Sequence, residues 1–424
     1  MESVCDIAII GGGAAGLAAA IFAAGHRPNQ RICILDGARS LGAKILVSGG
    51  ARCNVTNHRV TPDDYNAPTT FVRHVLSAFN EKKTVEWFRD MGVELKREET
   101  GKLFPVSDSS KTVLAALLNR CERLNIRILA NHRVSSIEAL DTNSTDTRNP
   151  TPESRFKITH SQGSLTATHL IMATGGRSLP LTGSDGAGWA MVQRLGHTVT
   201  ATYPALVPLL LRDDFFHASI SGLSLDVELS TFAQAQRIDH RAGSMLFTHF
   251  GISGPVAMDA SRHWVIAHAN GQQAKMTCSL LPGQDFATVE KMIIDRGQKH
   301  AKKALITTIS DLLPARILEA LLDHLRIDLR TPMAQLAREE RRKLVHGLTS
   351  LELPIVKDRG WNYAEVTAGG VPLSEVHHRD MQSRLVAGLY LIGEILDCDG
   401  RIGGFNFQWA WSTGYLAGKA AAQA

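Results

Sequence analysis

Residues 4–16 read VCDIAIIGGGAAG, and residues 31–36 read RICILD. The first stretch is a short apolar run that leads into the spacing G-x-G-x-x-G, and the second is an apolar run that ends in an acid. Short apolar runs rich in β-branched residues are typical of buried parallel strands. The Ala-rich segment 17–24 between them predicts a helix, which Gly25 and Pro28 would end. The order of strand, glycine turn, helix and strand predicts a βαβ unit.

The glycine spacing and the acid together predict a dinucleotide site. The first glycine allows a tight turn, the second lets a pyrophosphate approach the backbone, and the third lets the helix pack closely on the strand. The N–H groups at the start of the helix would bind the phosphates, and Asp36 would accept hydrogen bonds from the adenosine ribose. The predicted cofactor contacts in this part are Gly11, Gly13, Ala14, Ala15, Gly16, Asp36 and Gly37.

The C-terminal part of the chain indicates which dinucleotide binds, FAD or NAD. Residues 388–408 read GLYLIGEILDCDGRIGGFNFQ, which predicts a strand, a loop with Gly393 and Glu394, and a helix that starts near Gly404. In FAD proteins with two dinucleotide-binding folds, an acid after such a strand bonds the ribityl chain. A helix N-terminus then stabilises the flavin edge that becomes anionic on reduction. We therefore predict FAD as the cofactor, and an ordinary loop acid is the alternative reading of Glu394.

Two changes of pattern occur between these ends. Short alternating runs from 197 to 284 predict an antiparallel β subdomain, whereas 286–350 carries helical periodicity and charge. The polar, turn-rich segment 141–154 predicts a surface loop. Further predicted elements are helices over 70–92, 108–125 and 406–422, and strands over 131–138, 156–159, 168–174 and 389–392.

Composition sets the broad class. The chain has 424 residues with 44% hydrophobic and 21% charged residues, which predicts a globular protein of two or three domains. Its six cysteines show no CxxC spacing, so we expect neither a metal site nor a redox dithiol, and a cytoplasmic location. The apolar stretch 7–25 is broken by glycines and lacks a basic flank, so no membrane segment is expected.

Four motifs carry a resemblance to a known family. They are 42–57 (GAKILVSGGARCNVTN), 245–255 (MLFTHFGISGP), 363–371 (YAEVTAGGV) and 388–414. Together they resemble the YhiN/BaiN-like flavoproteins, which are also described as NAD(P)/FAD-dependent or aminoacetone-oxidase-like. The resemblance implies an α/β fold with a Rossmann-like FAD-binding domain, interrupted by a β-barrel-like domain and a small helical insert. The expected borders are 1–196 with 356–424, 197–284 with 346–355, and 285–345.

The resemblance also implies further cofactor contacts. A loop after the second strand would lie near the pyrophosphate and the flavin, Val134 would lend backbone groups to the adenine, and a late segment would meet the isoalloxazine edge. These residues are Lys44, Ser48, Gly49, Arg52, Cys53, Asn54, Thr56, Val134, Thr174, Gly175, Asn406, Phe407 and Gln408.

Three residues are candidates for catalysis. His249 would serve as acid or base, since histidine is the side chain most often used for proton transfer, or it simply anchors its loop. Cys53 would form a flavin adduct or tune the potential, or it is a buried packing residue. Asn54 is included because an amide there can bond the flavin ring.

The predicted function is that of an FAD-dependent oxidoreductase, which transfers a hydride between flavin N5 and a small organic substrate. NAD(P)H as reductant and dioxygen as acceptor both stay open. Residues 183–188 lack the preceding strand of a second dinucleotide fold, so NAD(P)H would bind without a Rossmann module of its own. Two alternatives remain, a flavin-dependent RNA-modifying protein and a flavin-bound redox sensor or electron carrier. On the main reading the partner is a small molecule, with no nucleic acid.

Overall fold

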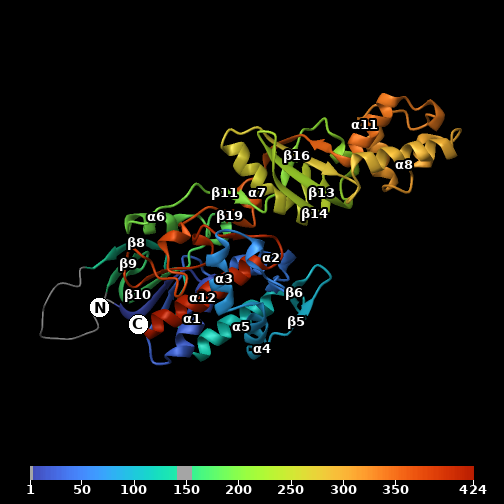
Figure 1. Ribbon diagram of the computed structural model, residues 1–424. Helices are drawn as coiled ribbons and strands as arrows, with labels where there is room; N and C mark the ends of the chain where they lie inside the picture. Colours follow the sequence, from blue (N-terminus) through green and yellow to red (C-terminus); the bar gives the residue numbers. More distant parts are fainter. Residues whose placement is uncertain (1–2, 141–154) are drawn as a thin grey trace, which may run out of the picture. The chain divides into compact units, whose positions relative to one another are not determined.

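The computed structural model describes residues 3–140 and 155–424 (Figure 1). The predicted surface loop at 141–154 lies outside the described residues. The chain divides into two compact units. Unit 1 comprises Met1–Thr202 and Val366–Ala424, and unit 2 comprises Tyr203–Glu365.

A mixed sheet forms the centre of unit 1. Five strands run parallel in the order β7-β2-β1-β10-β20, and β9 and β8 continue it antiparallel. The long strand β10 pairs with β9 along its first half and with β20 at its end. The C-terminal part of the chain therefore returns to the N-terminal sheet. The bounds are β1 Ser3–Ile10, β2 Ile32–Leu35, β7 Arg127–Leu129, β8 Val134–Ala139, β9 Phe156–His160, β10 Gly163–Met172 and β20 Leu389–Leu391.

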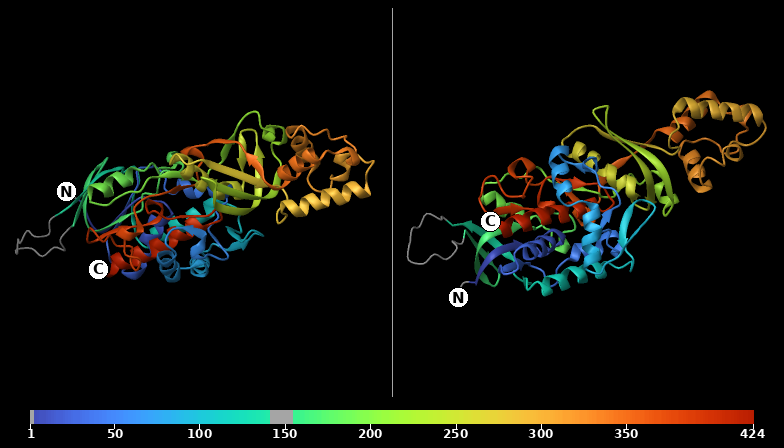
Figure 2. Two further views of the ribbon diagram at one scale, coloured as in Figure 1. Left: turned by 45° about the horizontal axis from the view of Figure 1, so that its top comes forward. Right: turned by 60° about the horizontal axis from the view of Figure 1, so that its bottom comes forward.

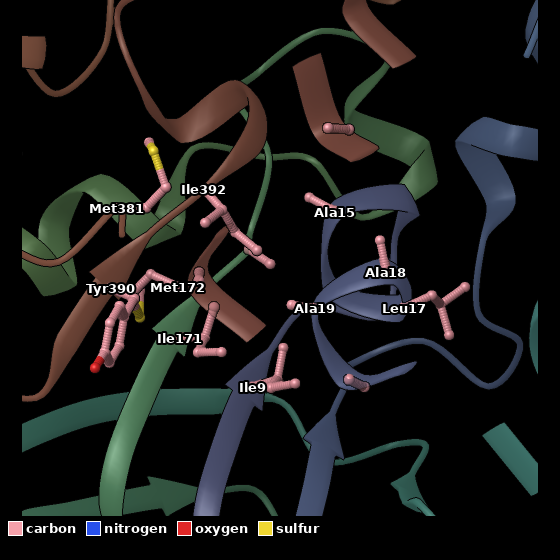
Figure 3. Close-up of a cluster of buried hydrophobic side chains, with 14 of the residues drawn as sticks. Ile9, Ala15, Leu17, Ala18, Ala19, Ile171, Met172, Met381, Tyr390 and Ile392 are labelled. Atoms are coloured by element: carbon pink, nitrogen blue, oxygen red, sulfur yellow. The ribbon is translucent and has the colours of Figure 1, made fainter. Parts of the chain in front are cut away.

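Helices α1 and α12 pack directly on each other, as both views of Figure 2 show in blue and red. Glycines allow this approach, because a Cβ atom on Gly418 would lie 2.3 Å from the carbonyl oxygen of Ala19. Figure 3 shows Ile9 of β1 beside Ala19 of α1 in the core of unit 1. The helices of unit 1 are α1 Ala14–His26, α2 Ala43–Ala51, α3 Thr69–Ala78, α4 Glu81–Asp90, α5 Ser110–Arg123, α6 Ala187–Arg194 and α12 Phe405–Gln423.

The predicted helix at 70–92 is two helices, α3 and α4. Phe79 leaves the helical conformation, and Asn80 starts the second helix by accepting a hydrogen bond from the Lys83 N–H at 3.1 Å. Asparagine is a preferred N-cap residue. Unit 1 also contains β3 Thr56–Asn57, β4 Tyr65–Asn66, β5 Leu95–Arg97, β6 Lys102–Pro105, β19 Val366–Ala368, β21 Asp399–Gly400, and the 3₁₀ turns Pro62–Asp64, Pro180–Thr182, Leu373–Glu375 and Gly393–Ile395.

The apolar stretch at 7–25 forms no single segment. Its first residues belong to β1 and the rest to the turn and α1. No helix within residues 3–140 and 155–424 combines the length and apolarity needed to cross a membrane.

A rolled antiparallel sheet forms the centre of unit 2. Its strand order is β17-β16-β13-β14-β15-β12-β18. Only Pro354 separates the two outermost strands, so the two edges of the sheet meet and give it a barrel-like form. The bounds are β11 Tyr203–Ala205, β12 Leu209–Leu211, β13 Ser224–Ala233, β14 Gln236–Thr248, β15 Gly251–Ser253, β16 Ala274–Ser279, β17 Leu351–Leu353 and β18 Ile355–Asp358.

The helical part of unit 2 shares the core of this sheet. Val289 of α8 and Leu344 of α11 belong to the same buried cluster as Cys278 of β16. The predicted borders of the three domains remain predictions. The other elements of unit 2 are α7 Pro255–Ala269, α8 Phe286–Lys299, α9 Leu305–Thr308, α10 Ala315–His324, α11 Arg338–Thr349, and the 3₁₀ turns Phe216–Ile220, Met333–Gln335 and Trp361–Tyr363.

Candidate functional site

The candidate site lies at the carboxyl edge of the parallel sheet in unit 1. Strands β1, β2, β10 and β20 run parallel, so the loops that follow them leave the sheet at one edge. In open α/β sheets this edge is where ligands bind. The N-terminus of α1 follows β1 directly, and its first N–H groups have no acceptor within the helix.

The glycine turn shows three different local surroundings. Gly11 has φ +105°, and a Cβ atom there would lie 2.3 Å from the carbonyl oxygen of Ala173. A Cβ atom on Gly16 would lie 1.9 Å from the carbonyl oxygen of Gly11. A Cβ atom on Gly13 would meet nothing within 4 Å. Packing therefore explains Gly11 and Gly16, whereas Gly13 leaves open space in front of α1. The predicted contacts Ala14 and Ala15 form the first turn of that helix.

Asp36 fixes the start of this turn. Its carboxylate accepts hydrogen bonds from the backbone N–H of Gly12 at 2.7 Å and of Ala38 at 2.8 Å. Each carboxylate oxygen keeps a further lone pair, so the group can still accept a ribose hydroxyl. Gly37 follows Asp36, and Val134 is a buried residue at the start of β8.

Glu394 lies in a polar network. One carboxylate oxygen accepts from Lys44 Nζ at 2.5 Å. The other accepts from Ser178 Oγ at 2.7 Å and from the Thr367 N–H at 3.0 Å. Lys44 also donates to Ser178 Oγ at 2.6 Å. The sequence predicts both charged residues, together with Gly393, as cofactor contacts, but it gives no sign of the bond between Lys44 and Glu394. It also misses Ser178.

Three polar atoms at this edge are buried and have no hydrogen-bond partner in the part of the chain that the structure describes. They are Asn54 Oδ1, Thr174 Oγ1 and Ser184 Oγ. A Cβ atom on Gly175 would lie 2.5 Å from Ser184 Oγ, so this loop is closely packed. A buried polar atom without a partner destabilises a protein by about 1–3 kcal/mol, and each one needs an explanation. A ligand with polar groups would supply these partners. The sequence motifs predict the first two residues as cofactor contacts, but they give no sign of Ser184.

The loop after the first turns of α2 is strongly bent. Ser48 has an extended ψ of 147°, and Gly49 has φ +55°. Cys53 is fully buried with φ +62°, and its N–H donates to the Ser48 carbonyl at 3.0 Å. Burial raises the pKa of the Cys53 thiol to about 12. The thiolate is the nucleophilic form of cysteine, so these surroundings favour the packing role.

Arg52 contacts an acid of the same unit. Its guanidinium lies 2.5 Å from Glu98 and 4.0 Å from the centre of the Phe104 ring. The side chain is half-exposed. The predicted contact between Arg52 and a phosphate or the flavin stays a prediction.

The start of α12 is anchored by amide side chains. Gln408 is fully buried, and its Oε1 accepts from Thr56 Oγ1 at 2.7 Å. Asn406 Oδ1 accepts from the Gly400 N–H at 2.8 Å, and its Nδ2 donates to the Gly400 carbonyl at 2.9 Å. A Cβ atom on Gly404 would lie 2.6 Å from the backbone of Thr56. These side chains hold the helix start in place. Its first backbone N–H groups, including that of Phe407, lack intrahelical acceptors and can face a ligand.

His249 belongs to unit 2. It is exposed in the turn between β14 and β15, and Thr248 Oγ1 closes this turn by donating to the Gly251 carbonyl at 3.0 Å. A Cβ atom on Gly251 would lie 2.2 Å from the carbonyl oxygen of Leu209. The turn is therefore fixed in shape. The catalytic role of His249 stays a prediction.

The glycines at 183–188 shape a turn in unit 1. Gly186 has φ +82° and begins α6, and a Cβ atom on Gly188 would lie 1.9 Å from Thr174 Oγ1. These glycines allow α6 to approach the loop after β10.

Among the described residues, no three His, Cys, Asp or Glu side chains gather as a metal site would require.

Comparison with known proteins gives the family. The family described as HI0933-like protein Rossmann domain matches residues 5–420. The chain is 33% identical over 418 residues to the 3-dehydro-bile acid delta(4,6)-reductase of Clostridium scindens, over 98% of this chain and 99% of that protein. It is 30% identical over 417 residues to the ribosomal RNA dihydrouridine synthase of Haemophilus influenzae, over 98% of both chains.

A solved structure shares the fold. The 3-ketosteroid delta1-dehydrogenase from Sterolibacterium denitrificans, in complex with 1,4-androstadiene-3,17-dione, matches with a TM-score of 0.52 and 11% identity over 100% of both chains. The expectation of an oxidoreductase is confirmed at the level of the family, because the most similar relatives include a reductase. The chain belongs to the HI0933-like Rossmann family, which confirms the predicted fold class and the resemblance to YhiN/BaiN-like proteins.

Proposed function

We propose that this protein is an FAD-dependent reductase of carbon–carbon double bonds that are conjugated to a carbonyl group. One observation carries the cofactor assignment. Thr174 Oγ1, in the loop after β10, and Asn54 Oδ1, in the loop after α2, are buried and have no hydrogen-bond partner within the described residues, and the backbone of Gly13 leaves open space before α1. These residues fit a bound dinucleotide, which would provide acceptors for N–H groups and donors for the unpartnered oxygens.

The residues of unit 1 divide the binding of FAD between them. Asp36 would hold the adenosine ribose, and the N–H groups of α1 next to Gly13 would hold the pyrophosphate. Glu394, whose charge is balanced by Lys44, would bond the ribityl chain. The start of α12 would stabilise negative charge on the flavin edge. FAD, when bound, supplies the hydride at its N5 atom.

The names of the relatives favour one substrate class. A 3-dehydro-bile acid delta(4,6)-reductase acts on double bonds conjugated to a 3-oxo group, and a dihydrouridine synthase acts on a uracil double bond conjugated to a carbonyl. In this chemistry the carbon distant from the carbonyl receives a hydride, and the adjacent carbon receives a proton. We assign the proton to His249, because histidine is the side chain that most often transfers protons in catalysis. NAD(P)H is the proposed source of the two electrons.

A uracil within RNA is the second candidate substrate. A groove in unit 2 is lined by Arg342, Lys343 and His346 of α11, together with the acids Glu339 and Glu352. Cationic side chains of this kind bind the phosphate backbone and give salt-dependent affinity. The two acids offset most of this positive charge, so the RNA alternative rests mainly on the ribosomal RNA dihydrouridine synthase among the relatives.

Product analysis tests the proposal. The FAD-loaded protein is incubated without oxygen with NADPH and either a 3-oxo-4,6-diene steroid or unmodified ribosomal RNA. We expect one of the two to gain two hydrogens, detected by mass spectrometry of the steroid or of the digested nucleosides. FAD-depleted protein is the control. If the flavin is reduced but neither substrate gains hydrogen, the protein is a redox sensor or electron carrier instead.

A further inference from the structure

Unit 2 carries an arginine held between two aromatic rings. The guanidinium carbon of Arg359 lies 4.0 Å from the centre of the Phe250 ring and 3.7 Å from the centre of the Tyr363 ring. Exposed His249 lies beside this stack, since its ring centre is 5.1 Å from that of Phe250. Tyr363 is half-exposed at 48%, so the stack reaches the solvent.

Backbone hydrogen bonds fix each member of the stack, two of them next to or on β12 and the third within its own turn. The Arg359 N–H donates to the Pro208 carbonyl at 3.0 Å, and the Phe250 carbonyl accepts from the Leu211 N–H at 3.1 Å. The Tyr363 N–H donates to the Gly360 carbonyl at 3.0 Å. Three segments that are distant in sequence therefore hold the stack in one place. Stacking on both faces restricts the guanidinium and leaves its N–H edge to make hydrogen bonds.

That N–H edge has no ion-pair or hydrogen-bond partner among the residues that the structure describes. Other arginines differ, because Arg31 and Arg296 donate to Asp6 and Asp311. The neighbouring carboxylate of Asp358 is occupied by the Gly360 N–H at 2.7 Å. A guanidinium with both faces covered and its edge unpartnered matches the planar geometry of an oxyanion such as a carboxylate or phosphate.

We propose that Arg359, held between Phe250 and Tyr363, binds an oxyanion on unit 2. This inference rests on the proposed reductase function, because that function supplies the two oxyanions considered as ligands. The shared chemistry is a bidentate oxyanion. A steroid with a side-chain carboxylate and a nucleotide phosphate are its two sources.

Calorimetric titration of the FAD-loaded protein tests the site with two matched pairs of probes. The first pair is a 3-oxo-4-ene steroid with a side-chain carboxylic acid and its methyl ester. The second pair is uridine 5′-monophosphate and uridine. We expect Arg359→Gln to weaken the charged member of one pair by about tenfold to a hundredfold and to leave its neutral counterpart unchanged. Loss for the acid alone identifies a carboxylate, and loss for the nucleotide alone identifies a phosphate.

Two further variants separate this role from a structural one. Tyr363→Leu removes one covering ring at an exposed position, and we expect a smaller loss confined to the same charged probe. Arg212→Gln is the control, because Arg212 is an exposed arginine of the same unit that pairs with Asp214 at 3.2 Å. It should change no affinity.

The outcomes separate this site from the proposed function. Equal losses for charged and neutral probes, or no loss for either charged probe, would overturn the oxyanion site. If wild-type protein binds neither charged probe better than its neutral counterpart, the site is overturned as well. Reduction of the neutral probes by NADPH is measured in parallel. If the wild-type protein reduces a neutral probe but Arg359→Gln binds the charged probes unchanged, the oxyanion site is refuted and the function stands. If Arg359→Gln weakens only a charged probe but no probe is reduced, the function is refuted and the site stands.

Discussion

At the scale of single residues, the three glycines of the first turn have different roles. Gly16 has no room for a side chain, since a Cβ atom there would lie 1.9 Å from the Gly11 carbonyl oxygen. Gly13 has room, because its Cβ position meets nothing within 4 Å and its φ of −83° suits any residue. Gly16 is therefore required for packing, and we propose that the open space at Gly13 serves the ligand.

This difference gives a paired prediction. Gly13→Ala should fold with unchanged thermal stability without FAD but bind FAD at least about tenfold more weakly, because its methyl group occupies the space for the pyrophosphate. Gly16→Ala should lower the yield of folded protein. FAD fluorescence titration and thermal melts of both variants measure the effects. Unchanged FAD affinity in the Gly13 variant would remove Gly13 from the site.

The ion pair between Lys44 and Glu394 gives a second prediction. Lys44→Met should lower the free energy of unfolding by about 2 kcal/mol, because it leaves a largely buried carboxylate without its charged partner. The double variant Lys44→Met/Glu394→Gln should recover most of this loss. Denaturant titrations measure both, and Lys96→Met, which breaks an exposed pair with Asp108, is the control. A double variant less stable than the single one would contradict the expected coupling.

At the scale of elements, tertiary contacts decide what local patterns leave open. The sequence predicts one helix at 70–92, but Asn80 caps a second helix there. The helical periodicity continues through this region, so the only sequence signal for the break is the single residue Asn80. The strand, glycine turn and helix at the start of the chain are predictable, because their apolar periods and turn residues are local.

The cap at Asn80 gives a third prediction. Asn80→Ala should lower the free energy of unfolding by about 1 kcal/mol, since the Lys83 N–H loses its acceptor. Asn80→Asp should retain most of the stability, because aspartate also caps helices. Urea unfolding followed by circular dichroism measures both. Equal losses in the two variants would show that the amide has another role.

A largely buried histidine of α7, His263, which contacts Asp239 of β14, predicts a dependence on pH. Burial lowers the pKa of His263 to about 4, although Asp239 lies 3.4 Å away and pairs with Arg241. The unfolded chain takes up this proton near pH 6.5, so the stabilisation is complete above that pH and is lost as the pH falls towards 4. The loss should reach about 3 kcal/mol and should be absent in His263→Gln. The control is His240→Gln, an exposed position on β14.

At the scale of the whole molecule, the two ends of the chain build one Rossmann-type sheet, and the sequence between these ends forms a second unit. The return of β20 to β10 follows from the motif at 388–408. The network of Lys44, Ser178 and Glu394 does not follow from it, because its members lie up to 350 positions apart. The sequence therefore predicts which segments build the site, and only the fold shows which side chains bond each other.

The most direct test of the central claim is an anaerobic spectral titration of the purified protein after loading with FAD. We predict one FAD per chain, bleaching of the flavin band by NADPH, and return of the band when a carbonyl-conjugated alkene is added. Gly13→Ala should bind little flavin under the same conditions. A wild-type protein that takes up no FAD, or bound flavin that no conjugated alkene reoxidises, would contradict the account.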